Sequence, residues 1–203
     1  MNRNSYSMYI AAICPMVIAT PGRLAAGIAL SLELCLLMLA GTGFRQLVRR
    51  LGIGMLQELT MLSFIIFFTL LWRQLLILMS PELALELGFV MYFPALSTFA
   101  ALFLFDAAED GFLPELRGNM LPVLRFSAYT AGMSLIRDVC GYGTLTFIAA
   151  HGTAETVVIR APVSVFIFLA TVPGALILAA LSLIGYLAAL KKMRMFSQME
   201  AAQ

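Results

Sequence analysis

Residues 24–40 read Leu-Ala-Ala-Gly-Ile-Ala-Leu-Ser-Leu-Glu-Leu-Cys-Leu-Leu-Met-Leu-Ala, and they contain a single charged side chain, Glu33. A helix of roughly 20 mostly apolar residues is long enough to cross the hydrocarbon core of a bilayer. Lipid offers no hydrogen bonds to an open backbone, so a span of this kind is helical. Five further stretches share this apolar character: residues 6–20, 56–71, 87–105, 120–136 and 163–190. The sequence therefore predicts an all-α integral membrane protein with six transmembrane helices.

The composition agrees with this prediction. Of 203 residues, 62% are hydrophobic and 12% are charged, whereas a soluble domain is about half apolar and about a quarter charged. The net charge of +2 gives no reason to expect a nucleic-acid partner. The sequence has no phosphate-binding loop, Ser–His–Asp set or CxxC pair, so soluble-enzyme chemistry within the chain is not expected. We expect one polytopic domain, residues 1–203, with membrane lipid around it.

The positions of Lys and Arg predict the orientation. Two basic clusters stand out: Arg45, Arg49 and Arg50 after the second apolar stretch, and Lys191, Lys192 and Arg194 after the sixth. Lys and Arg collect in cytoplasmic loops of membrane proteins. With six spans both clusters face the cytoplasm, and both termini do so too, whereas five spans would put one cluster on the wrong side. The expected location is the cell's inner (cytoplasmic) membrane.

Two short stretches resemble each other. Residues 8–15 and 91–98 open the first and fourth spans, and each contains a Met-Tyr pair and a proline. With three spans between their starts, the two halves would have opposite topology, at about residues 1–80 and 81–203. Short or Pro-interrupted segments at matching positions are typical of inverted repeats, which build sites near the bilayer midplane. Chance similarity between two apolar stretches explains the match equally well.

Five residues are candidates for function. Cys14 directly precedes Pro15, and a thiolate there could ligate iron, although a free cysteine is more often a small buried apolar residue. Glu33 lies inside a span, where a charge costs about 3 kcal/mol, so we expect it to serve ion passage or helix pairing, while a protonated or interface-bonded carboxyl explains it equally well. Arg137 and Asp138 end the fifth span, where capping of the helix end is more probable than chemistry. Asp106 is a weaker candidate for an ion path.

Several motifs together resemble a known family, the membrane subunits of Rnf and Nqr complexes. The first-span run at residues 12–20 is similar to the family's G-[IL]-C-x-x-L-A-V-[ST] stretch. Residues 136–145 resemble R-E-[IL]-L-G-x-G-T-L-F. The run at residues 173–178 resembles P-P-G-A-F-I-L, which favours the Rnf E and Nqr D type over the Rnf A and Nqr E type. The order and spacing of these motifs cover essentially the whole chain.

The resemblance implies a fold, a cofactor and partners. Members have six transmembrane helices in two inverted halves, and each pairs with a homologous subunit of opposite topology, here of the Rnf A or Nqr E type. Each subunit contributes two cysteines to a shared [2Fe–2S] cluster within the membrane. The complex couples ferredoxin:NAD or NADH:quinone electron transfer to Na⁺ or H⁺ movement, so this chain would be a translocase subunit that is not catalytic alone. Flavin and nucleotide cofactors would sit on partner subunits.

The chain departs from the family at one ligand. Cys14 matches the first-half cysteine, but Ala100 stands where the second is expected and Phe99 where the family has asparagine. Three arrangements remain open. A cluster could bind through three cysteines and a substitute ligand, Cys140 or Cys35 could replace the missing cysteine, or the subunit could have lost the cluster.

Two other functions fit the same sequence. Broken helices in an inverted repeat bind small solutes in many carriers, so a cluster-free paralogue could be a small-solute or ion transporter. A structural membrane anchor within a complex is the other alternative. The presence of iron separates the electron-transfer subunit from both.

Overall fold

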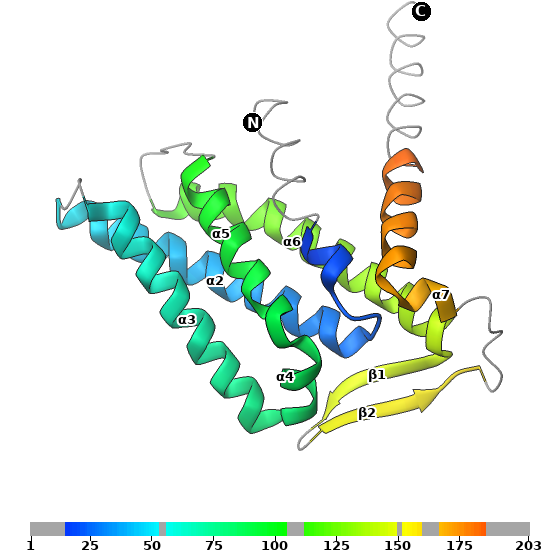
Figure 1. Ribbon diagram of the computed structural model, residues 1–203. Coiled ribbons are helices and arrows are strands. Elements are labelled where there is room, and N and C mark those ends of the chain that lie inside the picture. The colour runs from blue at the N-terminus through cyan, green and yellow to red at the C-terminus, as the bar shows by residue number, and fades with distance from the viewer. Residues whose placement is uncertain (1–14, 53–55, 105–111, 150–151, 160–166, 186–203) are drawn as a thin grey trace, which may run out of the picture.

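The computed structural model describes residues 15–52, 56–104, 112–149, 152–159 and 167–185 of the chain (Figure 1). The long helices are α2 (Leu24–Arg50), α3 (Gln57–Met79) and α6 (Phe112–Arg137). The shorter ones are residues 15–19, α4 (Pro81–Leu87), η2 (Gly88–Met91), α5 (Tyr92–Leu104), the π-helical turn η3 (Asp138–Tyr142), α7 (Ile167–Ala170) and Val172–Gly185. A β-hairpin of β1 (Thr144–Ala149) and β2 (Gly152–Val157) completes the described chain.

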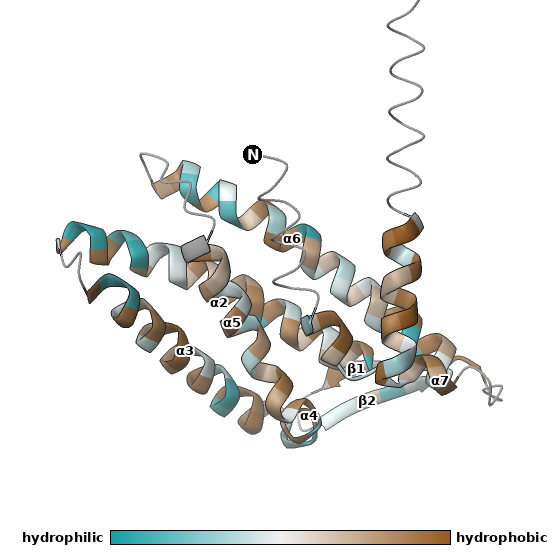
Figure 2. Cartoon of the chain, turned by 45° about the horizontal axis from the view of Figure 1, so that its top comes forward, coloured by the Kyte–Doolittle hydropathy of each residue, from teal (hydrophilic) through white to brown (hydrophobic). Residues whose placement is uncertain are grey.

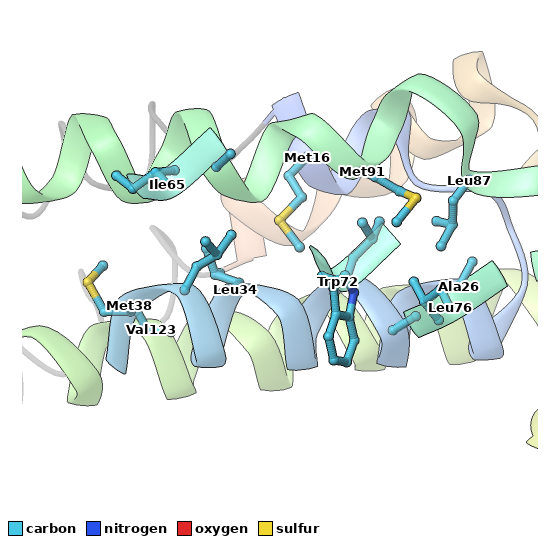
Figure 3. Packing of buried hydrophobic residues seen from close by; sticks show 14 of the residues in the cluster. Met16, Ala26, Leu34, Met38, Ile65, Trp72, Leu76, Leu87, Met91 and Val123 are labelled. Atoms are coloured by element: carbon cyan, nitrogen blue, oxygen red, sulfur yellow. The ribbon is translucent and has the colours of Figure 1, made fainter. Parts of the chain in front are cut away.

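Helix α2 is the centre of the structure, because α3, α5 and α6 all pack on it (Figure 2). Its buried positions run the whole length of the helix, from Leu24 to Val48. Side chains from residues 15–19, α3, α4, η2 and α6 converge on it, as Figure 3 shows for Met16, Trp72, Leu87 and Val123. Lipid is as apolar as these side chains, so close van der Waals packing and interhelical hydrogen bonds hold such helices together.

The α2–α6 interface is lined with small and polar residues. A Cβ added at Gly27 would collide with the Ser134 side chain, so the two backbones approach closely there. Further along, the Ser31 hydroxyl donates to the Ser127 carbonyl at 3.2 Å, and the Cys35 Sγ lies 3.3 Å from the Ser127 hydroxyl. Small residues that allow close approach, with hydroxyls bonded across the contact, are typical of helix pairs in membranes.

The packing partners fix the direction of each helix. Leu24 contacts Asp138 and Arg45 contacts Glu115, so α2 and α6 are antiparallel. Helix α3 returns beside α2, with Phe64 stacked on Phe44 at 4.0 Å between ring centroids. One end of the structure therefore carries Arg45, Arg49 and Glu115, which we call the Arg45 end. The opposite end carries the start of α2, the end of α6 and the hairpin, and we call it the Asp138 end.

Three helices are long and apolar enough to cross a membrane: Leu24–Arg50, Gln57–Met79 and Pro81–Leu102. Helix α3 shows why lipid suits them. Its buried residues recur every three or four positions, from Met61 through Ile65, Thr69 and Trp72 to Leu76, and form one stripe. Most of its other face is apolar and exposed, including Phe67 and Leu78. Such a continuous exposed apolar surface is unusual for a soluble monomer.

The fourth apolar stretch is interrupted, as the sequence predicts, but the break is not at the predicted place. The chain leaves α4 at Gly88, whose φ of 45° is one that residues with a side chain rarely adopt. It then passes through the 3₁₀ turn η2 before α5 begins at Tyr92. Pro94 lies in the first turn of α5, where its missing N–H breaks no helical hydrogen bond.

Other boundaries also differ from the prediction. The third span does not end at Leu71 as predicted, because the apolar run that follows continues the helix to Met79, and the Trp72 side chain is buried. Helix α6 begins at Phe112, eight residues before the predicted start of the fifth span, and contains Pro122. The stretch after it is a hairpin, so the fold is mostly helical rather than all-α. The last stretch is bent at Thr171, just before Pro173.

Candidate functional site

The Asp138 carboxylate joins the start of α2 to the hairpin. Its Oδ2 accepts hydrogen bonds from the backbone N–H of Leu24 at 3.1 Å and of Thr146 at 2.8 Å. The Thr146 hydroxyl also donates to Oδ2, at 2.7 Å, and the Thr144 hydroxyl donates to Oδ1, at 3.0 Å. Ala25 extends this network by donating its N–H to the Thr146 hydroxyl. A carboxylate is favourable at a helix N-terminus, where free N–H groups carry partial positive charge.

Arg137, the preceding residue, binds helix ends of the opposite polarity. Arg137 is 1% exposed, and its guanidinium donates to the carbonyls of Thr20 at 2.7 Å, Ala170 at 2.8 Å and Leu169 at 3.2 Å. Thr20 follows the helix of residues 15–19, and Ala170 ends α7. Carbonyls at helix C-termini lack intrahelical donors and carry partial negative charge, so a cation stabilises them.

Both residues thus lie where the sequence places them, at the end of α6, but each uses partners on other segments. We call this arrangement the Arg137–Asp138 junction. Nearby, Arg23 pairs with Glu155 at 2.9 Å and with Glu86 at 3.4 Å, which ties the hairpin to α4. These hydrogen bonds and ion pairs stabilise helix ends and the start of a strand. Among the described residues of the junction, Arg137 and Asp138 use their charged groups for these structural contacts.

The Arg45 end holds a second charged cluster. Glu115 is 3% exposed, and its oxygens lie 3.4 Å from an Arg45 nitrogen and 3.5 Å from an Arg49 nitrogen. Arg45 is also buried. The three charges connect the last turns of α2 to the first turn of α6, so this cluster too fastens two helix ends.

Glu33 is different, because it is buried without such partners. The side chain is fully buried in α2, and neither carboxylate oxygen has a hydrogen-bond partner among the residues that the structure describes. Phe44 follows Glu33 by eleven residues, or three helical turns, so both side chains lie on the same face of α2. The Phe44 ring stacks on Phe64 of α3, so this face is directed toward α3. At about 1.5 Å per residue, Glu33 is roughly 14 Å from Leu24 and 18 Å from Arg45, near the middle of the helix.

Other polar atoms in this part of the structure also lack partners. The indole nitrogen of Trp72 in α3 and the hydroxyl of Thr98 in α5 are buried, and no described residue bonds them. Buried polar groups in native proteins are nearly always hydrogen-bonded to protein, water or an ion. The α2, α3 and α5 group therefore contains a carboxylate, a hydroxyl and an indole N–H whose bonding capacity the described protein leaves unused.

The remaining sequence candidates do not come together. Cys14 and Asp106 lie outside the described residues. Cys35 bonds Ser127 inside the α2–α6 interface, while Cys140 is exposed in η3. Ser127 and Cys140 are thirteen residues apart along the α6–η3 segment, which corresponds to about 20 Å. Ala100, in α5, is half-buried and carries no ligand atom.

These positions bear on the [2Fe–2S] cluster that the resemblance implies. No three His, Cys, Asp or Glu side chains come together to hold a metal ion in the described part of the chain. Cys35 and Cys140 are too far apart to ligate one cluster. The described residues by themselves therefore do not form a site for the cofactor, and Cys14, the expected ligand, lies outside them.

The sequence missed three of the groups that form these networks. Glu115, Thr144 and Thr146 are not among the candidates that the sequence singles out. Alternation of β-branched and other residues over 144–149 is the signal for a strand that could have identified the hairpin.

Comparisons with known proteins give no further guide: no family model, no curated protein and no solved structure matches this chain.

Proposed function

We propose that this chain is a membrane subunit of a redox-driven, cation-translocating complex of the Rnf/Nqr kind, with Glu33 as a group on the cation path. The single observation that carries the proposal is the buried, unpartnered carboxyl in the middle of α2. Ionisable residues inside membrane spans are costly and are usually functional. Na⁺ and H⁺ are the cations that a carboxylate of this kind can take up.

The directions of the helices support the proposed six-span topology. Helices α2, α3, the α4–α5 segment and α6 alternate in direction between the Arg45 end and the Asp138 end. We place the Arg45 end in the cytoplasm, because Arg45, Arg49 and Arg50 gather there. Spans through residues 6–20 and 163–190 would complete six helices in two inverted halves and put both termini in the cytoplasm. The break at Gly88–Met91 supports an interrupted fourth span.

Electron relay rests on the resemblance of the sequence motifs. Cys14 is the residue of this chain that we expect to contribute to a cluster shared with a homologous subunit of opposite topology. The structure gives Cys35 a structural role, and Ala100 cannot ligate iron. A cluster-free carrier is the second candidate, and the observation that favours it is Ala100 at the expected ligand position. Both candidate functions use Glu33 to bind the cation. They differ in whether the chain also transfers electrons.

Carbodiimide labelling tests the role of Glu33. Dicyclohexylcarbodiimide is an apolar reagent that enters bilayers and modifies protonated carboxyl groups. We expect it to modify Glu33 in the intact complex, with Glu115 as the internal control, because two arginines hold that buried carboxylate in ion pairs. Protection by Na⁺ would identify Na⁺ as the cation, and dependence on pH alone would identify H⁺. Absence of modification at Glu33 would contradict the proposal.

Iron analysis tests the electron relay. The complex should be purified anaerobically with its partner subunits, assayed for iron and acid-labile sulfide, and examined by electron paramagnetic resonance after reduction. We expect Cys14→Ser to abolish the [2Fe–2S] signal of this site and Cys35→Ser, as the matched control, to retain it. A complex without such a signal would contradict the electron-transfer role and favour the cluster-free carrier.

A further inference from the structure

Two arginines on the outer face of α6 have no partner in the described chain. Arg117 and Arg125 are exposed, and among the residues that the structure describes neither forms a hydrogen bond or an ion pair. Both line one open hollow of about 550 Å³. Its other lining residues are apolar or lack a side chain: Leu113, Pro114, Gly118, Leu121 and Pro122.

The hollow lies toward the Arg45 end of the molecule. Arg117 is two residues after Glu115, which pairs with Arg45 and Arg49. The backbone of Arg125 is about 12 Å further along α6. Side chains on a helix tilt toward its N-terminus, and a long arginine can extend along apolar surface to keep its charge near the interface. Arg125 can therefore share one ligand with Arg117 although its backbone lies deeper.

We propose that this hollow binds the phosphate headgroup of an anionic lipid. Two guanidinium groups without a counter-charge supply the complement to a phosphate, which arginine binds well. The leucine and proline side chains between them suit the start of an acyl chain. Basic pockets on the cytoplasmic side of membrane proteins bind anionic lipid headgroups. The proposed orientation is used only to assign the lipid to the cytoplasmic leaflet, so the inference does not depend on the cation or the cluster.

A carboxylate of the described chain is a poor alternative partner for these arginines. Among the described residues the exposed acids are Glu58, Glu82, Glu86 and Glu155, and these lie at the ends of helices or in the hairpin. A second copy of the same surface would therefore bring no described acid to the level of Arg125. The phosphate could instead come from a soluble ion, and the experiment separates the two sources.

The test is native mass spectrometry of the full chain released from bilayer discs containing phosphatidylglycerol and phosphatidylcholine. We expect selective retention of phosphatidylglycerol, reduced about fivefold for each arginine removed, and so about 25-fold in the double variant Arg117→Gln/Arg125→Gln. Arg73→Gln is the matched control, because Arg73 is an exposed arginine of α3 that does not line this hollow. The double Arg→Lys variant keeps both charges and should retain most of the binding.

Three results would overturn the inference. Retention of phosphatidylglycerol by the double Gln variant at the wild-type level would show that these arginines do not bind it. An equal loss in Arg73→Gln would show a general effect of charge. Displacement of the lipid by excess inorganic phosphate would assign the hollow to a soluble anion. Should the Gln variant fail to fold, the two single variants give the same comparison.

Discussion

At the scale of single residues, the structure separates three buried acids by their partners. Asp138 accepts hydrogen bonds from two backbone N–H groups and two hydroxyls, and Glu115 faces two arginines. Glu33 has neither. An uncompensated buried charge is costly, so the first two acids are explained by stability and the third is the one for which function is the better explanation.

Replacing Asp138 tests the structural role of the junction. Asp138→Ala leaves the N–H groups of Leu24 and Thr146 buried without their acceptor, and we expect a loss of about 2–4 kcal/mol in the free energy of unfolding. Hydrogen exchange should increase at the start of α2 and in β1. The control Glu155→Ala removes a half-exposed ion pair with Arg23 at the same end and should cost less than about 1 kcal/mol. Unchanged protection in Asp138→Ala would refute the capping role.

Sequence reasoning reached these residues but not their partners. It located Glu33 inside a span because one acid in seventeen residues is conspicuous, and it located Arg137 and Asp138 at a helix end. It did not identify their partners: Asp138 caps a helix 114 residues away, and Arg137 binds carbonyls of two other segments. Such long-range contacts depend on how the helices pack, which local pattern does not encode.

At the scale of elements, the α2–α6 pair is the principal contact, and it depends on small side chains. Its hydroxyl bonds and close approach occur at Gly27, Ser31, Ser127 and Ser134. Apolar periodicity predicted that both segments are helical, but it could not show that they are neighbours. Segment ends were the weakest predictions, because Gly88 and Thr171 break the helices while nearby prolines are tolerated in first turns.

Substitution of two glycines of α2 by alanine should change the stability in opposite directions. In Gly27→Ala the new methyl group would collide with Ser134, so we expect a loss of about 1–3 kcal/mol in stability. In Gly43→Ala the added methyl meets nothing within 4 Å, and the better helix propensity of alanine should stabilise by up to about 1 kcal/mol. Thermal unfolding in detergent measures both. Adding Ser134→Gly should rescue Gly27→Ala, and equal responses of the two glycines would argue against the close contact.

At the scale of the whole molecule, the hydrophobic pattern of the sequence predicted membrane-crossing helices, but it predicted their arrangement only in part. The sequence predicted spans at residues 24–40, 56–71 and 87–105, and the structure shows longer helices over these stretches, three of which are able to cross a membrane. The six-span count and the inverted halves remain predictions. The hairpin was not predicted, because its twelve strand residues lie between two apolar stretches and only those stretches were assigned a structure.

The proposed cation path depends on this whole arrangement. Glu33 is useful for translocation only if it lies between the two ends of the bundle, and the charged clusters at both ends place it there. Those clusters fasten the start of α2 to the hairpin, to α4 and to the end of α6, and they fasten the last turns of α2 to the first turn of α6. The structure thus combines fixed helix ends with an unsatisfied carboxyl in the middle.

Cation uptake driven by electron transfer in proteoliposomes of the whole complex tests this account most directly. We predict that Glu33→Gln, which keeps the size of the side chain but cannot carry charge, abolishes uptake per electron transferred. Glu58→Gln, at an exposed position near the start of α3, should leave uptake at the wild-type level. Undiminished uptake by a folded Glu33→Gln complex would contradict the central role of this carboxyl.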